Sequence, residues 1–371
     1  MNALNGIIQK NNMLNILVDA YVFDCGFEGT ATYIHGLYTS LINNKNVTVT
    51  FCAAKQEKLL LYFPQSNVRF IKPKFKSRTL QMLLGYTLQI KNGNYDYAHF
   101  QYYVPPIKKC RYIVTIHDIL FLYFKKYFPI SKKLLYRFLF SYSAKKSDVI
   151  LTGSPYSKKC ISEKFSIAEN RIGMTSDAAS ENSSMNIDVK KKYSIRNYIH
   201  FVSRFEKRKN HISLLRAYIK LELHKNYDLV FIGNHKRGDK LKCYRELLQI
   251  IPKNISHYIH FFQDIDDIEL NAFYRQSSCF VYPSFAEGFG IPPLEAGINR
   301  CKVLCSNQTA MADFIFFKYQ FNPNNPGELE QKLMEIIKDE NYPFEEIKQA
   351  ISKKYSWDKT AENFFNILKN I

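Results

Sequence analysis

The chain has 371 residues, 46% of them hydrophobic and 23% charged, which is ordinary globular composition and enough length for two domains. Its formal net charge is +19, and most of the excess lies in residues 1–200, where 28 Lys and Arg stand against 12 Asp and Glu, so an anionic partner such as nucleic acid or a lipid surface is expected. No apolar run reaches membrane-spanning length, no secretion signal opens the chain and no cysteines form a Cys-x-x-Cys pair, so we expect a cytoplasmic protein with reduced thiols.

Strand and helix patterns alternate along the first half. An apolar run over 15–20 leads through a glycine-containing loop at 26–30 to residues 33–42 at helical spacing, which predicts strand, loop and helix. Strands that alternate with helices indicate a parallel α/β sheet. A polar stretch over 177–188 is typical of a linker. Further strands are predicted over 47–53, 97–101, 112–116 and 149–153.

The second half repeats this alternation, which predicts a second α/β domain of similar size. We place the first domain at 1–185 and the second at 186–352. Strands are predicted over 198–203, 227–233, 257–262, 279–283 and 302–306. Helices are predicted over 211–223, 239–250, 268–276, 328–339 and 357–369.

The most informative segment follows the strand predicted at 279–283. Glu287 and Glu295 bracket seven residues that contain Gly-Phe-Gly and two prolines. Glycines allow close backbone approach, prolines suit the first turn of a helix, and N–H groups at a helix N-terminus bind phosphate. The alternative is a simple crossover with two surface carboxylates, which the glycines and prolines disfavour.

A basic turn follows the strand predicted at 198–203. Arg204 ends this strand, and a tight turn brings Lys209 back near it before the next helix. A guanidinium and an ammonium group together can neutralise a diphosphate leaving group. A solvated basic turn explains the segment equally well by itself. The two glutamates of the same domain favour the interpretation as a diphosphate site.

In the first half, His117 and Asp118 follow the strand predicted at 112–116. Ligands bind at the carboxyl ends of parallel strands, so His117 could bond a sugar hydroxyl or orient an acceptor. A structural histidine is the commoner case. Gly29 and Thr30, in the loop after the first strand, could approach a phosphate or an acceptor.

Asp264 and Asp266 match the Asp-x-Asp pattern that holds a divalent cation in some sugar transferases. They also stand where a helix begins, and capping of that helix is a sufficient explanation. We therefore expect no metal ligand in this chain.

Residues 121–146 alternate aromatic side chains with Lys and Arg, and one helical stripe is formed by Leu134, Leu135, Phe138, Leu139 and Tyr142. A second basic cluster lies at 72–78. A basic amphipathic helix with aromatic residues is typical of docking on an anionic membrane. A helix packed on the sheet with a solvated basic face is the alternative, and the charge of the first half favours the membrane.

With these motifs the chain resembles, nearly end to end, the retaining family 4 glycosyltransferases of the GT-B fold. The residues of these motifs are most similar to those of bacterial mannosyltransferase-type enzymes of surface polysaccharide assembly. The chain departs from the family pattern at 299–303, which lack the usual Gly and Pro, and at Asp313, where Glu is common. The resemblance is carried by Glu287 and Glu295, by Ser203-Arg204 with Arg208-Lys209-Asn210, by Thr115-Ile116-His117-Asp118 and by residues 154–157.

The resemblance implies an α/β protein of two Rossmann-like domains whose parallel sheets face each other across a cleft, with a helix in 353–371 that crosses back to the first domain. Arg204 and Lys209 would hold the diphosphate, Glu287 would contact the transferred sugar, and His117 would lie beside it. These four are the expected catalytic residues. The expected donor-binding residues are Gly29, Thr30, Asp118, Ser203, Phe262, Ile265, Gly288, Phe289, Gly290, Ile291 and Glu295.

The same resemblance implies retaining, metal-independent transfer of a hexose from a nucleotide-diphosphate sugar to a lipid-linked glycan. GDP-mannose is the first choice of donor, and UDP or dTDP sugars stay open. No cofactor beyond this co-substrate and no nucleic-acid partner is expected, and the location would be cytoplasmic, peripheral on the inner face of the plasma membrane. A nucleic-acid-binding protein and a non-catalytic sugar-nucleotide-binding protein are the alternatives from other classes.

Overall fold

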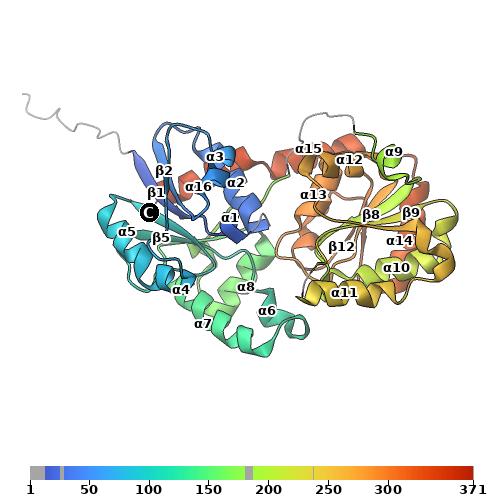
Figure 1. Cartoon of the computed structure of the whole chain (residues 1–371), viewed down its shortest axis with the longest axis horizontal. Helices are drawn as coiled ribbons and strands as arrows, with labels where there is room; N and C mark the ends of the chain where they lie inside the picture. Colours follow the sequence, from blue (N-terminus) through green and yellow to red (C-terminus); the bar gives the residue numbers. More distant parts are fainter. Residues whose placement is uncertain (1–12, 26–28, 180–186, 237, 371) are drawn as a thin grey trace, which may run out of the picture.

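The computed structural model describes residues 13–25, 29–179, 187–236 and 238–370. They form two parallel sheets that lie side by side, each covered by helices on both faces (Figure 1). The strands read as nearly continuous apolar runs because both faces of each sheet are buried. The predicted α/β class with two parallel sheets is confirmed.

The first sheet has seven strands in the order β3-β2-β1-β4-β5-β6-β7. Strand β1 pairs with both β2 and β4, so the direction of the strand order reverses between β1 and β4. Such a reversal point opens a crevice at the carboxyl ends of the strands. The strands are β1 (Leu14–Asp19), β2 (Val47–Cys52), β3 (Val68–Ile71), β4 (Tyr97–Gln101), β5 (Arg111–Thr115), β6 (Val149–Thr152) and β7 (Ile172–Met174).

The second sheet has six strands in the order β10-β9-β8-β11-β12-β13, and its reversal lies between β8 and β11. The two loops with the predicted Arg–Lys and Glu-x7-Glu motifs follow β8 and β11, so the sheet order brings them together. The strands are β8 (Tyr198–Val202), β9 (Asp228–Ile232), β10 (Ile259–Phe262), β11 (Cys279–Tyr282), β12 (Val303–Ser306) and β13 (Tyr319–Phe321).

Helices cover both sheets, and no described helix combines the length and hydropathy needed to cross a bilayer. With the first sheet lie α1 (Val22–Cys25), α2 (Gly29–Leu41), α3 (Gln56–Tyr62), α4 (Arg78–Leu80), the π-helix η1 (Gln81–Gly85), α5 (Tyr86–Asn92), α6 (Leu120–Tyr123), η2 (Lys125–Tyr127), α7 (Ile130–Lys146), α8 (Pro155–Phe165) and η3 (Glu169–Arg171). Then follow α9 (Val189–Tyr193), η4 (Lys207–Lys209), α10 (His211–Lys220), η5 (Leu223–Lys225), α11 (Gly238–Leu248), η6 (Lys253–Tyr258), α12 (Asp267–Gln276), α13 (Ile291–Ile298), η7 (Thr309–Asp313), α14 (Pro326–Lys338), α15 (Phe344–Lys354) and α16 (Trp357–Lys369).

The last helix, α16, lies among the elements of the first sheet, far from the strands that precede it in sequence (Figure 1). It packs along α2, where the Trp357 ring approaches Gly36 closely. The hydroxyl of Thr360 donates to the Ser176 carbonyl at 2.8 Å. The chain therefore passes between the two domains twice, once after β7 and once before this returning helix.

Some predicted elements differ in extent. The helix predicted to reach residue 223 ends at Lys220, because Glu222 has a left-handed φ of 51°. The strand predicted from residue 257 begins at Ile259, after the 3-10 turn η6. The predicted apolar stripe at 134–142 lies within α7, which begins at Ile130 directly after Pro129, while the segment before it forms the separate short helices α6 and η2.

Candidate active site

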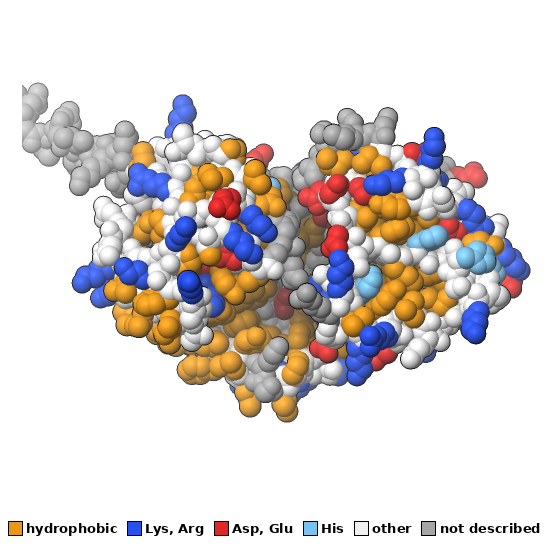
Figure 2. Space-filling view, viewed as in Figure 1, with side chains coloured by type: hydrophobic (Ala, Val, Ile, Leu, Met, Phe, Trp, Pro, Cys, Tyr) orange, Lys and Arg blue, Asp and Glu red, His pale blue; other side chains and the backbone are white. Residues whose placement is uncertain are grey.

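A cleft of about 710 Å³ lies between the carboxyl ends of the two sheets, in the hollow between the domains (Figure 2). Its walls come from both domains. The predicted site residues that line it are Gly29, Thr30, His117, Asp118, Ser203, Arg204, Lys209, Glu287, Gly288, Phe289, Gly290, Ile291 and Glu295. Residues 26–28 of the predicted glycine loop lie outside the described residues.

Glu287 lies at the centre of the second-domain wall and is buried. Its Oε1 accepts from Lys209 Nζ at 2.7 Å, and its Oε2 accepts from Arg208 at 2.9 Å. The hydroxyl of Ser284 donates to Oε1 at 2.5 Å. Although burial acts in the opposite direction, the charges of Lys209 and Arg208 lower the pKa of Glu287 to about 2. The carboxylate is thus ionised and fixes both cations.

The loops after β8 and β11 are tied together by their backbones. The Phe285 N–H donates to the Arg208 carbonyl at 2.8 Å, and the Asn210 amide donates to the Pro283 carbonyl at 3.0 Å. Lys209 also donates to the Tyr282 hydroxyl at 3.0 Å. This bracing holds the cations in place before any ligand arrives, which is the preorganisation that charge stabilisation needs.

Arg204 is the more exposed cation of the cleft, with 41% of its side chain accessible. Its Nε lies 3.2 Å from Glu206, which also contacts Arg208 at 3.1 Å. The predicted pair Arg204 and Lys209 therefore lies in one cleft together with Arg208. The sequence named Arg208 as part of the family motif but gave it no role in the site, whereas its neighbour Lys207 lies 3.5 Å from Glu246 and does not line the cleft.

The Gly-Phe-Gly segment forms the start of α13. Gly290 caps this helix with φ of 112°, a conformation that favours glycine. The first N–H groups of a helix have no intrahelical acceptor, so this start can offer donors to an anion. The prolines Pro292 and Pro293 lie in its first turn, as the sequence indicated.

The first domain contacts the same segment. The hydroxyls of Ser154 and Ser157, at the start of α8, donate to the Gly288 carbonyl at 2.6 and 3.0 Å. A Cβ added to Gly288 would lie 2.6 Å from the Asp118 side chain. Only glycine therefore permits this approach of the two domains. Asp118 accepts from the Leu120 N–H at 3.0 Å, and burial raises its pKa.

Glu295 lies one turn further along α13. Its Oε2 accepts from the Tyr274 hydroxyl at 2.9 Å. Burial raises its pKa to about 7, so it changes charge near neutral pH.

His117 faces the cleft from the first domain. Its Nε2 lies 2.9 Å from the Gln101 side-chain oxygen, and this bond leaves Nδ1 as an acceptor. Burial lowers the pKa of His117 to about 4, so the ring is neutral at pH 7. A neutral ring with an open acceptor nitrogen can bind a hydroxyl.

Asp177 is a cleft residue that sequence reasoning placed in a linker. It is 5% exposed, and its Oδ1 has no hydrogen-bond partner among the described residues. Burial raises its pKa to about 7. Its sequence neighbours Ala178 and Ala179 are also buried. A small polar stretch gives no signal of such burial, and the unpaired oxygen makes Asp177 a candidate for binding a polar group in the cleft.

Two predicted donor-binding residues do not line the cleft. The ring of Phe262 packs 4.5 Å from that of Tyr193, and Ile265 packs against the same apolar cluster. Only their backbone could serve a nucleotide. Asp264 pairs with Lys236, and Asp266 caps α12 by accepting from the Glu269 N–H at 2.8 Å, as the capping interpretation predicts.

Comparison with known proteins gives matches in both domains. Residues 27–175 match the family described as Glycosyltransferase Family 4, and residues 184–356 match Glycosyl transferases group 1. O-antigen chain mannosyltransferase B of Escherichia coli is 27% identical over 293 residues, which are 74% of this chain and 75% of that protein. Serotype-specific mannosyltransferase WbdA of Escherichia coli is 30% identical over 244 residues, 61% of this chain but only 29% of that protein.

Solved structures of similar fold cover nearly the whole chain. Sucrose-phosphate synthase from Thermosynechococcus elongatus has a TM-score of 0.79 at 14% identity, over 96% of this chain and 98% of that one. Anabaena HepE in complex with UDP and glucose has a TM-score of 0.74 at 12% identity, over 96% and 100%. At these identities the likeness shows the fold.

Proposed function

Because the chain belongs to the family 4 glycosyltransferases of the GT-B fold, we propose that it transfers a hexose from a nucleotide-diphosphate sugar to a lipid-linked glycan of a surface polysaccharide. GDP-mannose is the first candidate donor, since several relatives are named as mannosyltransferases. A UDP or dTDP sugar is the alternative, and the HepE structure was solved with UDP.

The observation that carries this proposal is the placement of three cations beside a helix start in one interdomain cleft. Arg204, Arg208 and Lys209 supply positive charge, and the start of α13 supplies N–H groups. A diphosphate fits this set, because guanidinium groups and helix N-termini both bind phosphate oxygens. The same charges let the leaving group depart without a metal ion.

The remaining cleft residues suit a sugar nucleotide and an acceptor. Glu295 would accept hydrogen bonds from ribose hydroxyls when ionised. His117 and Asp177 would each accept from a sugar hydroxyl, because both line the cleft, the Gln101 bond leaves His117 Nδ1 as an acceptor, and Asp177 Oδ1 has no partner among the described residues. Glu287 would hold Lys209 and Arg208 and would contact the transferred sugar at the edge of that pair.

We propose that transfer retains configuration by attack on the face the leaving group occupies. The bond from the anomeric carbon to the diphosphate oxygen breaks, and the bond to the acceptor oxygen forms on the same face. The acceptor proton passes to the departing diphosphate, whose charge Arg204 and Lys209 stabilise. Domain closure over the cleft excludes water and limits hydrolysis of the donor.

The donor is identified by a thermal-shift screen of the whole chain against GDP, UDP and dTDP and their sugars, since a ligand of the native state raises the melting temperature. We expect GDP-mannose to give the largest shift. No shift with any of these nucleotides would contradict the proposal.

The diphosphate clamp is tested with the donor so identified. Arg204→Ala and Lys209→Ala should each lower transfer by roughly 10²-fold, the scale of losing one charge-stabilising donor. Lys207→Ala is the matched control, because Lys207 belongs to the same turn but does not line the cleft. Near wild-type turnover in either clamp variant would remove the assignment.

A further inference from the structure

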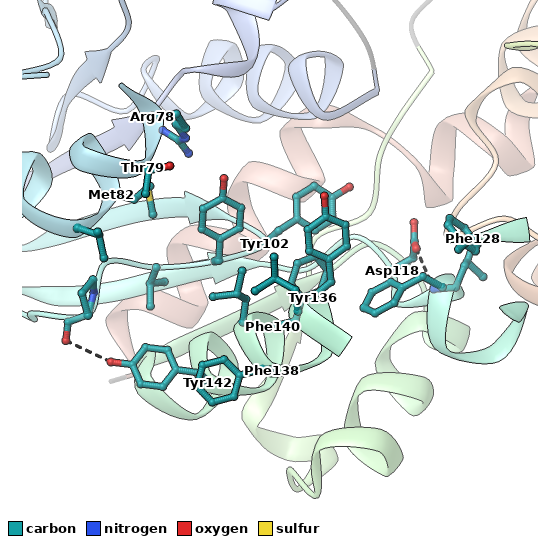
Figure 3. A pocket seen from close by; sticks show the side chains of 18 of the residues that line it. Arg78, Thr79, Met82, Tyr102, Asp118, Phe128, Tyr136, Phe138, Phe140 and Tyr142 are labelled. Carbon is teal, nitrogen blue, oxygen red and sulfur yellow. Dashed lines mark hydrogen bonds between the residues drawn. The ribbon is translucent and has the colours of Figure 1, made fainter. Parts of the chain in front are cut away.

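A second cavity, of about 990 Å³, opens in the first domain between α4–η1 and α7 (Figure 3). It adjoins the cleft, since Tyr102, Asp118, Arg204 and Arg208 line both. Away from these four residues its wall is almost wholly aromatic and aliphatic. That wall includes Met82, Leu83, Val104, Phe121, Phe128, Leu135, Tyr136, Phe138, Leu139, Phe140 and Tyr142.

The polar groups of this wall are mostly engaged within the protein. Arg78 donates to Asp19 at 2.9 Å and so has its charge compensated. The Tyr142 hydroxyl donates to the Pro106 carbonyl at 3.2 Å, a bond drawn in Figure 3. The cavity therefore presents apolar surface to its contents, which suits a hydrocarbon and not a bare polysaccharide.

Large apolar side chains also surround the mouth of this cavity on the outside of the domain. Figure 2 shows hydrophobic side chains gathered along the lower edge of the first domain, where Figure 1 places α4 and α7. A contiguous apolar surface of this kind marks an interaction site. Those exposed by 45–77% are Leu80, Leu83, Leu84, Ile130, Leu134, Leu135 and Phe138.

The charge around the mouth is positive. Residues 58–147 carry 17 Lys and Arg but only two carboxylates, Asp96 and Asp118. Exposed lysines flank both rims, at positions 72, 74 and 76 before α4 and at 125, 126, 145 and 146 around α7. An apolar mouth within positive charge complements an amphipathic molecule with an anionic head group.

We propose that this cavity holds the hydrocarbon chain of the acceptor lipid. The inference rests on the proposed transferase function and specifies its acceptor. Arg204 and Arg208 line both spaces, so a chain in the cavity would end beside the diphosphate clamp. The accepting sugar must then lie close to the lipid. The enzyme would extend a lipid that carries a short glycan, and a preceding reaction must attach the first sugar to that lipid.

The proposal is tested by chain-length dependence of binding, with butyl, octyl and dodecyl phosphate as probes below their micelle-forming concentrations. Each buried methylene should raise affinity about fourfold, as measured by titration calorimetry on the whole chain. Affinity independent of chain length would overturn the proposal.

Variants at the mouth locate the site. Leu83→Trp and Leu135→Trp narrow the opening at exposed positions that the fold tolerates, and each should weaken dodecyl phosphate binding at least tenfold. Leu61→Trp is the matched control, because Leu61 is 83% exposed, lies in α3 and does not line the cavity or its mouth. An equal loss of dodecyl phosphate affinity in the mouth variants and the control would overturn the assignment. A wild-type dimer in sedimentation that only the mouth variants dissociate would also overturn it, because a second copy of the chain would then cover the mouth.

The same variants separate this proposal from the one on which it rests. GDP, UDP and dTDP should shift the melting temperature of the mouth variants as they shift the wild type. If no nucleotide shifts the wild type but chain binding persists, the transferase proposal fails and the lipid site stands. If nucleotides bind and the alkyl probes do not, the lipid site fails alone.

Discussion

At the scale of single residues, Glu287 compensates two buried cations at once. Glu287→Ala would leave the buried Lys209 ammonium group without its carboxylate, whereas Arg208 keeps Glu206, and losing one partner of a buried pair costs about 3–5 kcal/mol. We expect a loss of this size in urea unfolding at pH 7. Because the folded-state pKa of about 2 lies below the ordinary 4.5, the stabilisation is complete above pH 4.5 and is lost as the pH falls toward 2.

The control for this variant is Glu345→Ala. Glu345 pairs with Arg300 on the surface, where both side chains are more than half exposed. Exposed pairs contribute little, so the unfolding curve should not move. A Glu287→Ala protein as stable as the control would contradict the view that Glu287 stabilises the fold through its buried ion pair.

Glu295 predicts a pH dependence of nucleotide binding. Its pKa of about 7 means that the carboxylate form, which accepts from ribose hydroxyls, grows as the pH rises through 7. The affinity for the nucleotide should therefore increase between pH 6 and pH 8 in calorimetric titrations. Glu295→Gln stays neutral throughout, so its affinity should be weaker at pH 8 and flat across this range. An equal slope in both proteins would assign the titration elsewhere.

Asp177 should contribute to the rate of transfer and not to the affinity for the nucleotide. Asp177→Asn replaces one of the two acceptor oxygens by an NH₂ donor and removes the negative charge of the carboxylate, and we expect transfer to fall at least tenfold while the affinity for the nucleotide is kept. Asp313→Asn is the control, since Asp313 also has a buried unpaired oxygen but does not line the cleft. If both variants have similar transfer rates, Asp177 has a structural role and does not contact the reacting molecules.

At the scale of elements, the contact of α2 with α16 depends on Gly36. A Cβ at this position would lie 2.0 Å from the Trp357 ring. Gly36→Ala should lower the free energy of unfolding by about 1–3 kcal/mol, the usual cost of overpacking, despite the better helix propensity of alanine. Gly327→Ala in the first turn of α14 meets no atom closer than 3.5 Å and should be neutral or slightly stabilising. Chemical denaturation of both variants checks this difference.

The elements that could be predicted from sequence are those with strong apolar runs, such as β1, β8 and β11. Strands β3, β7 and β13 escaped prediction because they lie at sheet edges, span three or four residues and are partly exposed. Most of the cleft could be anticipated because its residues follow strands directly. The roles of Arg208, Asp177 and the serines of α8 could not be anticipated, although Arg208 and residues 154–157 belong to recognised motifs, since these roles depend on burial and on contacts between distant segments.

At the scale of the molecule, the positive charge of the first domain predicts salt-dependent membrane association. The chain should sediment with vesicles containing phosphatidylglycerol, and less so as NaCl rises from 50 to 500 mM. Lys145→Glu with Lys146→Glu should weaken this binding strongly, since both flank the apolar mouth. Lys242→Glu with Lys353→Glu makes the same charge change on the second domain and should have a smaller effect. If both double variants weaken vesicle binding equally, the binding depends on net charge alone and not on the face around the apolar mouth.

The hydrogen bonds from Ser154 and Ser157 to the Gly288 carbonyl have a consequence for when the enzyme becomes competent. A carbonyl and the next N–H belong to one planar unit and point in opposite directions. By fixing the Gly288 carbonyl, the first domain also sets the direction of the Phe289 N–H, one of the expected donors to the sugar nucleotide. The direction of this second-domain amide is therefore set by side chains of the first domain. Separation of the two domains would free the Gly288 carbonyl, so this amide is held in one direction only while the two domains are in contact.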